Sequence, residues 1–447
     1  MQLLSINIEN FRCFKNFNIN FAPGASVFIG RNGSGKTSLI KAILYALNFI
    51  FTTDKSLGDD ILAAGNPDLK IKSMEINEFY QNNHEDLPSV FANIHAVANY
   101  KDEEFDWDIY KRSTKNASAN SLKYRNAYHK FMNIFKKYNE LPLLAYFSDS
   151  FPHRLSNISN FAKAQISNGK NIIRNFGYYQ WDNENACTTI WENRLINSMI
   201  IDMQLQKGND YIHNEVDFVT KCVIGISQPI SKQCDNSFII NDIFFAFNEK
   251  NQPILWLKLK DGNEIRFKDL PAGYRRIYSI ALDMAYRAYI LNAGLKTESK
   301  NIEGIVLIDE IDLHLHPSLA LDILSRLQKT FPKVQFIITT HSPLVLSNLK
   351  NDNGRNVIYK IIQGKIAPQQ LPNIYGIDYN TTLLNALDTG KSDERLENIK
   401  NAILRAMLLH HERIEKAKKE ELRIYLKDNN DYDRVMKEIR KEYEMDK

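Results

Sequence analysis

The stretch GRNGSGKTSL, Gly30 to Leu39, follows a short apolar run, ASVFI, and precedes a helical pattern, LIKAILYALNFIF. It fits G-x-x-x-x-G-K-[ST], in which the backbone amides of a glycine loop surround a phosphate group. In this pattern Lys36 reaches the β- and γ-phosphates of a nucleotide, and the hydroxyl of Thr37 binds Mg²⁺. The strand before and the helix after it favour this interpretation over an ordinary glycine turn. The predicted nucleotide-binding residues are Gly30, Arg31, Asn32, Gly33, Ser34, Gly35, Lys36, Thr37 and Ser38.

A second motif supplies the carboxylates that hydrolysis of a nucleotide needs. The run GIVLIDEIDLHLHP, Gly304 to Pro317, predicts a buried strand that ends in Asp309 and Glu310. A parallel central strand delivers such residues to the carboxyl edge of a sheet, where ligands bind. We expect Asp309 to complete the Mg²⁺ shell through water and Glu310 to position and deprotonate the attacking water.

A third strand repeats this design. In VQFIITTHSPLVL, the apolar residues from Val334 to Ile338 are followed by Thr339, Thr340 and His341. An imidazole at that edge could form a hydrogen bond to the γ-phosphate and so report hydrolysis. A capping or core histidine is the alternative, which the position after the Asp-Glu strand disfavours.

The remaining patterns predict a mixed fold. Two antiparallel strands are expected before the phosphate loop, and residues 91–112 predict a hairpin with the turn KDEE. Residues 151–230 are predicted to be helical, whereas 238–268 are rich in strand patterns and LPLLAYF predicts a short buried strand. Aromatic spacings of four and three predict a helix over 122–138 whose aromatic face belongs to the core rather than to a base-stacking surface.

Composition limits the class of protein. With 447 residues and 44% hydrophobic content, the chain can bury a large core divided into two or three lobes. No stretch of about 18 uncharged apolar residues occurs, and the N-terminus lacks a leader pattern, so we expect a cytoplasmic protein without a membrane segment. The four cysteines form no C-x-x-C pair, which indicates neither a disulfide framework nor a zinc site.

Positive charge is concentrated in one segment. Residues 111–181 contain twelve basic residues against two acidic ones, although the net charge of the whole chain is only +4. This segment either binds nucleic acid or faces an acidic surface of the same protein or of a partner. The basic residues are Lys111, Arg112, Lys115, Lys123, Arg125, Lys130, Lys136, Lys137, Arg154, Lys163, Lys170 and Arg174.

In order along the chain, the motifs IENFRCF, GRNGSGKTS, FKDLPAGYRRI, LIDEIDLHLHP and ITTHSP resemble those of ABC-type ATPases of the SMC, RecF and OLD group. The stretches LLAYFSDSFPHR, LPAGYRRIYSIALDMAYR and IYGIDYNTTL are most similar to the stand-alone ATPases of Septu-type phage-defence systems, including those associated with retrons. The resemblance covers about residues 1–385.

The resemblance implies further site residues. Arg12 would lie beside the nucleotide, and Leu270 to Gly273 match the signature segment, which contacts the γ-phosphate bound to the other subunit. Ala272 and Gly273 would offer their amides, but Pro271 replaces the usual serine and removes one donor. Slow hydrolysis follows as a hypothesis. For the Q-loop glutamine, Gln81 is only a weak match.

The resemblance also implies an architecture and a function. The expected α/β fold is an ABC-type head with an antiparallel lobe: 1–110 and 236–385 form the two halves of the head, 111–235 a basic helical insertion or lid, and 386–447 a helical tail. The expected activity is ATP hydrolysis with Mg²⁺ by a homodimer or a higher even oligomer. By the same resemblance, the ATPase would control an HNH-type effector nuclease in defence against phages. A RecF-like repair or chromosome-maintenance ATPase is the alternative, while a transporter subunit suits the long insertion poorly. A neighbouring nuclease or reverse transcriptase gene would favour defence.

The tail is not expected to be a nuclease domain. Its D-x-D, Asp431 to Asp433, lies in a polar break that is ordinary loop chemistry, and His410-His411 is expected inside one helix from Asp393 to Leu426. Adjacent residues on a helix do not converge on one metal ion. An apolar stripe is instead predicted to bind a partner or a second copy. It contains Leu396, Ile399, Ile403, Met407 and Ile414.

Overall fold

The structure is a computed structural model of the whole chain. It describes residues 1–52, 69, 71–81, 88–113, 120–150, 159–167, 172–182, 188–204, 210–230, 234, 236–292, 298–377, 394–426, 432, 433, 435–437, 439, 440 and 443. The chain divides into two compact units, Met1–Tyr379 and Asn380–Lys447.

A six-stranded sheet lies at the centre of the first unit, in the order β13-β12-β3-β11-β10-β6. The strands from β12 to β6 are parallel, and β13 is antiparallel to β12. Every residue of the parallel strands is buried, as expected where both faces of a sheet are covered. This confirms the predicted α/β class. The strands are β3 (Ala25–Ile29), β6 (Leu143–Phe147), β10 (Gly304–Ile308), β11 (Val334–Thr339), β12 (Asn356–Lys360) and β13 (Gln369–Gln370).

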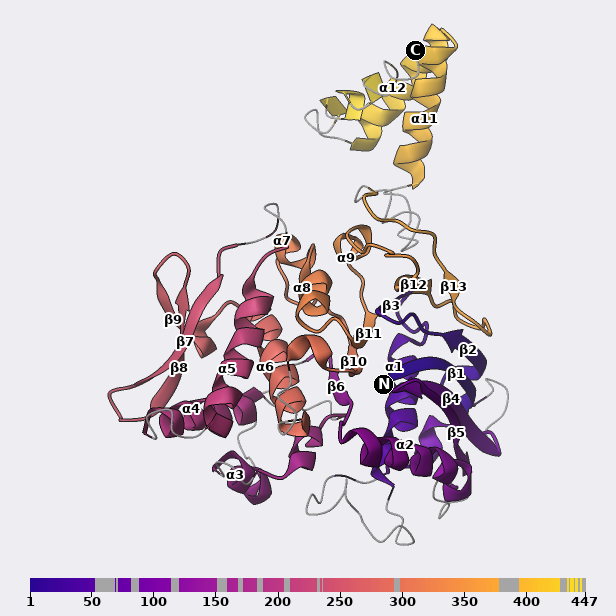
Figure 1. The fold of residues 1–447 in the computed structure, drawn as a ribbon. Helices are drawn as coiled ribbons and strands as arrows, with labels where there is room; N and C mark the ends of the chain where they lie inside the picture. Colours follow the sequence, from indigo (N-terminus) through magenta and orange to yellow (C-terminus); the bar gives the residue numbers. More distant parts are fainter. Residues whose placement is uncertain are drawn as a thin grey trace. The chain divides into compact units, whose positions relative to one another are not determined.

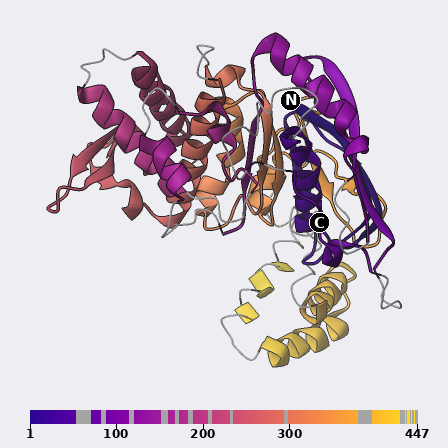
Figure 2. The same ribbon diagram turned by 90° about the horizontal axis from the view of Figure 1, so that it is seen from below.

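Helices and a second sheet cover this central sheet. Helices α6 (Ala272–Asn292) and α8 (Ile323–Thr330) lie on one side, and α1 (Lys36–Leu47) lies on the other (Figure 1). An antiparallel sheet, in the order β2-β1-β4-β5, packs against α1 (Figure 2). Its strands are β1 (Gln2–Phe11), β2 (Phe14–Asn20), β4 (Phe91–Tyr100) and β5 (Glu103–Arg112).

The antiparallel strands agree with the sequence patterns. The two N-terminal strands and the hairpin over 91–112 are confirmed, but the turn is shorter than the predicted KDEE. It consists of Lys101 and Asp102, whose φ angles are 54° and 64°. Two-residue turns with positive φ at both positions match the twist of paired strands, which explains the tight reversal.

Helix α2 (Arg125–Tyr138) carries the predicted aromatic face. Tyr128 and Phe131 are at most 1% exposed, and Phe131 lies 6.0 Å from Phe49, ring centre to ring centre. The aromatic face is therefore core, as expected, except for Tyr138 at its end, which is 37% exposed.

The segment after β5 contributes to more than one layer. β6 lies within the stretch expected to be an insertion, yet it forms the edge of the central sheet and pairs with β10. Helices α3 (Asn160–Ser167), α4 (Thr188–Gln204) and α5 (Asp210–Ser227) confirm the predicted helical region. A fully buried ion pair between Arg194 and Glu215, 2.6 Å apart, joins α4 to α5. None of the helices in the described ranges is both long and apolar enough to span a membrane.

A three-stranded sheet, β7-β8-β9, precedes α6 and packs against α4 and α5. Its strands are β7 (Ile240–Phe247), β8 (Pro253–Leu259) and β9 (Glu264–Arg266), in agreement with the predicted strand-rich region. Shorter helices connect the larger elements of this unit. They are α7 (Pro317–Ala320), α9 (Pro343–Ser347) and the 3-10 helices η1 (Asn48–Phe51), η3 (Ile76–Glu78), η4 (Ser121–Lys123), η5 (Arg174–Tyr178), η6 (Phe267–Asp269) and η8 (Ser299–Asn301).

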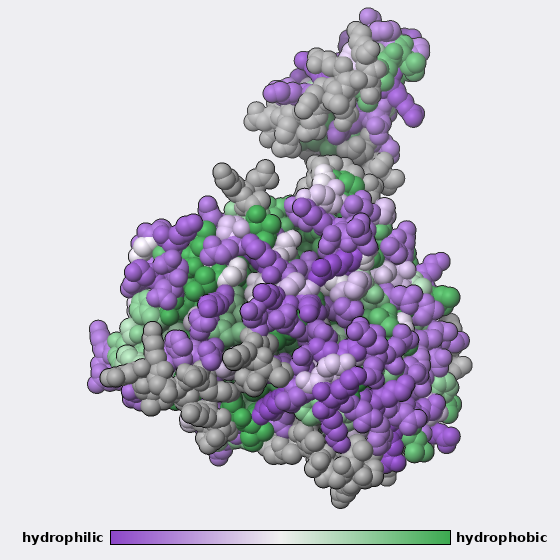
Figure 3. Space-filling model, in the orientation of Figure 1, coloured by the Kyte–Doolittle hydropathy of each residue, from purple (hydrophilic) through white to green (hydrophobic). Residues whose placement is uncertain are grey.

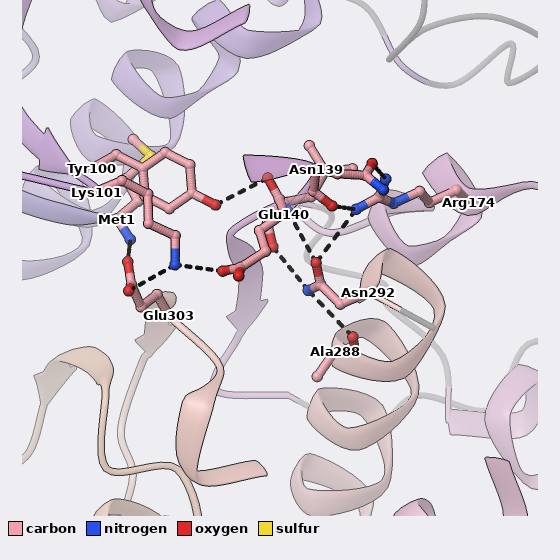
Figure 4. A network of polar contacts seen from close by, with 10 residues as sticks. Met1, Tyr100, Lys101, Asn139, Glu140, Arg174, Ala288, Asn292 and Glu303 are labelled. Carbon is pink, nitrogen blue, oxygen red and sulfur yellow. Dashed lines mark hydrogen bonds and ion pairs between the residues drawn. The ribbon is translucent and has the colours of Figure 1, made fainter. Parts of the chain in front are cut away.

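A polar network joins the antiparallel sheet to the start of β10 and the end of α6 (Figure 4). Glu303, just before β10, accepts hydrogen bonds from the Met1 amino group and from Lys101 at 3.1 Å each. Lys101 also pairs with Glu140. At the last residue of α6, the side chain of Asn292 accepts from the amide of Leu141 at 3.0 Å. The network thus links the β4–β5 turn to two elements that extend toward the carboxyl edge of the central sheet.

The second unit contains a helical hairpin rather than the single long helix expected over Asp393–Leu426. Helices α11 (Glu394–Leu408) and α12 (Glu412–Leu426) are separated at His410, whose φ is 52°. The amide of His411 donates to the Ala406 carbonyl at 2.8 Å, and that of His410 donates to the Met407 carbonyl. This is the Schellman arrangement that ends helices, with histidine where glycine is usual.

The apolar stripe predicted to bind a partner is largely used inside this unit. Ile399 and Ile403 are at most 2% exposed and pack in a core with Leu422 and Ile439. Leu396 and Met407 are partly buried against the same core, whereas Ile414 is 50% exposed. The prediction of an open stripe was wrong because the hairpin folds α12 over the apolar face of α11.

Candidate active site

The predicted phosphate loop connects β3 to α1 at the carboxyl edge of the central sheet. Gly30, Gly33 and Gly35 have φ angles of 156°, 78° and 112°. A Cβ at Gly30 would lie 2.7 Å from the Ile361 carbonyl oxygen, and one at Gly35 would lie 2.7 Å from a ring carbon of Phe14. Glycine is therefore required at both positions. Of the other loop residues, Ser34 is buried, Ser38 is half-buried, and Arg31, Asn32 and Thr37 are exposed.

The ammonium group of Lys36 lies over this loop. It donates hydrogen bonds to the carbonyl oxygens of Gly30 at 2.8 Å and of Arg31 at 3.3 Å. Burial lowers the pKa of Lys36, and the nearby carboxylates of Asp309 and Glu310 oppose that change. The structure thus brings the lysine of the loop and the acidic pair after β10 into one electrostatic environment.

Asp309 follows β10 and faces the start of α1. Its Oδ2 is 3.5 Å from the Thr37 hydroxyl, and its Oδ1 accepts a hydrogen bond from Thr339. Burial, together with the charge of Asp149, raises the pKa of Asp309, although the Thr339 bond acts in the other direction. A hydroxyl and a carboxylate at this distance are the hard oxygen donors that Mg²⁺ prefers, so Thr37 and Asp309 fit the expected metal.

Glu310 has an unusual backbone conformation. Its φ is 49°, a left-handed value that few non-glycine residues adopt. Its amide donates to the Thr339 hydroxyl at 2.8 Å, and its carbonyl accepts from the guanidinium of Arg276 at 3.2 Å. Local strain of this kind persists only where the surrounding structure holds it.

His341 follows β11 at the same edge. The amide of the preceding Thr340 donates to the Phe28 carbonyl at 3.1 Å, which places this turn beside the end of β3. The Thr340 hydroxyl donates to Asp312, so the turn is also tied to the segment after β10. The His341 side chain itself is half-buried.

The expected signature segment forms the beginning of α6. Pro271 and Ala272 are exposed, whereas Gly273 is buried. A Cβ at Gly273 would lie 2.7 Å from the His314 carbonyl oxygen, so this end of α6 packs on the segment that follows Asp309 and Glu310. Pro271 immediately precedes the helix, and its carbonyl accepts the first helical hydrogen bond, from Arg275, at 3.0 Å.

Arg12 lies in the turn between β1 and β2 with φ of 50°. Its guanidinium pairs with Glu78 at 3.1 Å, and Glu78 also accepts a hydrogen bond from the hydroxyl of Tyr45 on α1 at 2.6 Å. Arg12 and Gln81 line the same cavity of about 910 Å³, which also borders α1. The structure therefore brings Gln81 near Arg12.

Sequence reasoning did not identify three contacts. Thr339 and Arg276 both hold the acidic pair, and Glu78 holds Arg12. Thr339 stands in the quoted motif, where two threonines precede the histidine, so its position carried a signal. In the sequence, Arg276 is one of several charged residues in a helical pattern and has no distinguishing signal. Glu78 and Arg12 are 66 positions apart, so no local pattern predicts their pairing.

Comparison with known proteins gives several relatives. The chain is 26% identical over 402 residues to the retron Vc95 probable ATPase of Vibrio cholerae, covering 79% of this chain and 72% of that protein. It is 43% identical over 94 residues to the retron Ec83 probable ATPase of Escherichia coli, covering 21% of this chain and 17% of that one. It is 38% identical over 115 residues to the Septu protein PtuA of Bacillus mycoides, covering 25% and 15%.

Among solved structures, the SMC head bound to the C-winged helix domain of ScpA matches with a TM-score of 0.44 and 12% identity, covering 83% of this chain and 98% of that one. A RecF structure matches with a TM-score of 0.42 and 16% identity, covering 83% and 98%. The expected similarity to ATPases associated with retrons and to Septu proteins is confirmed. The profile of the AAA ATPase domain matches residues 1–346, and the chain therefore belongs to that family, AAA_15.

Proposed function

We propose that this protein binds ATP with Mg²⁺, closes a dimer around it, hydrolyses it slowly and thereby regulates a partner nuclease in anti-phage defence in the cytoplasm. The observation that carries the ATPase part is the approach of the Thr37 hydroxyl to within 3.5 Å of the Asp309 carboxylate, beside the buried Lys36. The retron and Septu relatives support the defence setting.

The site residues have separate tasks in this proposal. Lys36 exchanges its bonds to the Gly30 and Arg31 carbonyls for phosphate oxygens, and the glycine-loop amides bind the β-phosphate. Held by Thr37 and Asp309, Mg²⁺ would neutralise charge that develops on the phosphates. Glu310 accepts the proton of the attacking water, and His341 donates a hydrogen bond to the γ-phosphate.

The exposed start of α6 supports the proposed dimer. Helix N-termini attract anions because their first amides lack partners within the helix. In this proposal Ala272 and Gly273 of one copy face the γ-phosphate bound by the other, so that neither site is complete alone. Pro271 supplies no amide or hydroxyl there, which makes turnover slow and ATP chiefly a clamp.

The effector is a separate chain, an HNH-type nuclease by analogy with Septu-type systems. Asp433 is an exposed residue in the second unit, and Asp431 lies outside the described residues. The described residues hold no group of three or more His, Cys, Asp or Glu side chains that could bind a metal ion. Purified protein that cuts DNA with Mg²⁺ or Mn²⁺, and stops cutting on substitution of Asp431 and Asp433 by alanine, would contradict this assignment.

Two variants test the ATPase. Lys36→Ala should abolish ATP binding, because it removes the cation that reaches the phosphates. Glu310→Gln should bind ATP as the wild type does and accumulate the ATP-bound dimer, with turnover reduced by about 100-fold or more. Equal turnover by wild type and Glu310→Gln would rule out the assigned base, and unchanged ATP affinity of Lys36→Ala would rule out the assigned phosphate loop.

A further inference from the structure

We propose that Thr339 is a positioning residue for ATP hydrolysis: its hydroxyl fixes the metal-facing oxygen of Asp309 and, at the same time, the left-handed backbone of Glu310. This inference rests on the proposed function. It assigns to one buried hydroxyl the coupling between the metal ligand and the general base.

The contacts of Thr339 single it out at the carboxyl edge of the sheet. Thr339 is the last residue of β11 and is 1% exposed. Its hydroxyl donates to Oδ1 of Asp309 and accepts the amide of Glu310 at 2.8 Å. Its carbonyl accepts the amide of Ile311 at 3.1 Å, so the chain on both sides of Glu310 is fastened to one residue.

The two carboxylate oxygens of Asp309 are thereby distinguished. Oδ1 is occupied by Thr339, and Oδ2 faces the Thr37 hydroxyl at 3.5 Å. A carboxylate held on one side by a hydrogen bond presents its other oxygen in a fixed direction. The Thr339 hydroxyl therefore sets the direction in which Asp309 offers an oxygen beside Thr37.

The backbone of Glu310 needs the same hydroxyl. At φ of 49° its amide lies outside the regular ladder between β10 and β11, and the Thr339 hydroxyl is its acceptor. A valine at this position keeps the branched shape but removes the acceptor of the Glu310 amide and the donor to Oδ1 of Asp309. Serine keeps the hydroxyl and loses only a methyl group. Comparing the valine and serine variants therefore separates the effect of the hydroxyl from that of the methyl group.

The experiment compares ATP binding by the full chain in wild type, Thr339→Ser and Thr339→Val, first in EDTA and then across a titration of free Mg²⁺. Thr339→Val should bind ATP in EDTA as the wild type does. We expect Mg²⁺ to tighten ATP binding, and this variant should need at least about tenfold more free Mg²⁺ than the wild type for the same increase in ATP affinity. Its turnover should be reduced by about 10- to 100-fold. Thr339→Ser should stay within about threefold of wild type in both measurements.

Thr330→Val is the matched control, because Thr330 is a threonine on α8 whose hydroxyl donates to the Arg326 carbonyl at 3.0 Å. It should titrate with Mg²⁺ as the wild type does. If Thr339→Val does not fold, Thr339→Ala can be compared with Thr339→Ser instead, because alanine lacks the hydroxyl and serine retains it. Unchanged Mg²⁺ dependence in the variant without the hydroxyl, equal impairment of the serine variant, or loss of ATP binding in EDTA would each overturn the proposal. Failure of the wild type to bind ATP would instead overturn the proposed function.

Discussion

The guanidinium of Arg276, on the helix that begins with the expected signature segment, donates a hydrogen bond to the backbone carbonyl of Glu310 at 3.2 Å. It also donates to the carbonyls of Asp309 at 3.0 Å and of Ser148 at 3.2 Å. Arg276 is 1% exposed, and burial lowers its pKa while the surrounding carboxylates, Asp149 first among them, oppose that change. One side chain thus joins α6 to the ends of β6 and β10.

Replacing Arg276 should weaken both folding and turnover. Arg276→Met removes the arginine donor from the buried carbonyls of Ser148 and Asp309, which should lower the free energy of unfolding by about 2–4 kcal/mol. Arg276→Lys keeps the charge but lacks the planar fork that reaches carbonyls of two strands, so it should recover only part of that loss. Urea unfolding and steady-state ATP turnover measure the two effects. Equal stability of wild type and Arg276→Met would show that these hydrogen bonds contribute little.

Dimerisation should depend on the exposed first residue of α6. Ala272→Asp places a negative charge where the γ-phosphate of the facing copy would bind, although an acidic residue suits a helix N-terminus within its own chain. We expect the variant to bind ATP like the wild type but to stay monomeric with ATP in the Glu310→Gln background, as judged by light scattering. A dimer that forms equally well with and without the Ala272→Asp substitution would place the interface elsewhere.

Restoring the missing donor should speed hydrolysis. Pro271 is exposed, so serine can replace it without disturbing the core. Pro271→Ser adds an amide and a hydroxyl at the start of α6, and single donors of this kind change turnover by about 100- to 1000-fold in other enzymes. We expect faster ATP turnover with little change in the affinity for ATP, measured by phosphate release and equilibrium binding. Unchanged turnover would mean that this position does not face a phosphate.

The fold was predictable where local pattern and buried environment agree. The strands that end at Ile29, Ile308 and Thr339 are short apolar runs followed by polar residues, and such runs require burial on both faces. Because these strands are parallel, they all end at the same edge of the sheet. The approach of Thr37 to Asp309 could therefore be predicted although the two residues are far apart in the sequence.

Other features depend on contacts that no local pattern encodes. β6 is a short apolar run like β10, but its pairing with β10 joins residues about 160 positions apart. The break at His410 was missed because histidine rarely takes the left-handed position that ends a helix, and the packing of α12 on α11 decides it. The stripe on α11 looked open because periodicity reveals an apolar face but not what covers it.

Acid should weaken the network before β10 through Glu303. Burial alone would raise the pKa of Glu303, but the Met1 amino group and Lys101 lower it below its usual value of 4.5. Burial also lowers the pKa of the Met1 amino group to about 5, so at neutral pH the positive charge beside Glu303 is that of Lys101. The folded state therefore binds this proton less readily than the unfolded chain, so the stabilisation is present above pH 4.5 and is lost as the pH falls through the folded pKa. Glu303→Gln should cost about 1–2 kcal/mol at neutral pH and less in acid, measured by urea unfolding. An equal cost at both pH values would contradict a charge effect.

Within the basic segment 111–181, we expect the exposed face of α2 to be the part that binds nucleic acid. Of the basic residues in 111–181, Lys111 is 8% exposed and donates to the Met74 carbonyl, and Arg174 donates to the Leu291 and Asn139 carbonyls, so these two act within the fold. On α2 the side chains of Lys130, Lys136 and Lys137 are exposed, and α2 contains no acidic residue. Figure 3 shows hydrophilic residues over this part of the first unit.

Charge reversal on this face should separate the two interpretations of the basic segment. The 14 residues of α2 extend about 21 Å, enough for its lysines to contact several phosphates of a backbone. Lys130→Glu, Lys136→Glu and Lys137→Glu together should weaken salt-sensitive binding of labelled duplex DNA or RNA, and each lost phosphate contact should reduce the slope of log affinity against log salt by about 0.9 for B-DNA. The same reversal at the exposed Lys250, Lys260 and Lys333 changes the net charge equally and should have a smaller effect. If the wild type shows no salt-sensitive binding at low ionic strength, or both triple variants lose binding equally, α2 does not provide a nucleic-acid surface, and an acidic protein surface becomes the partner to test.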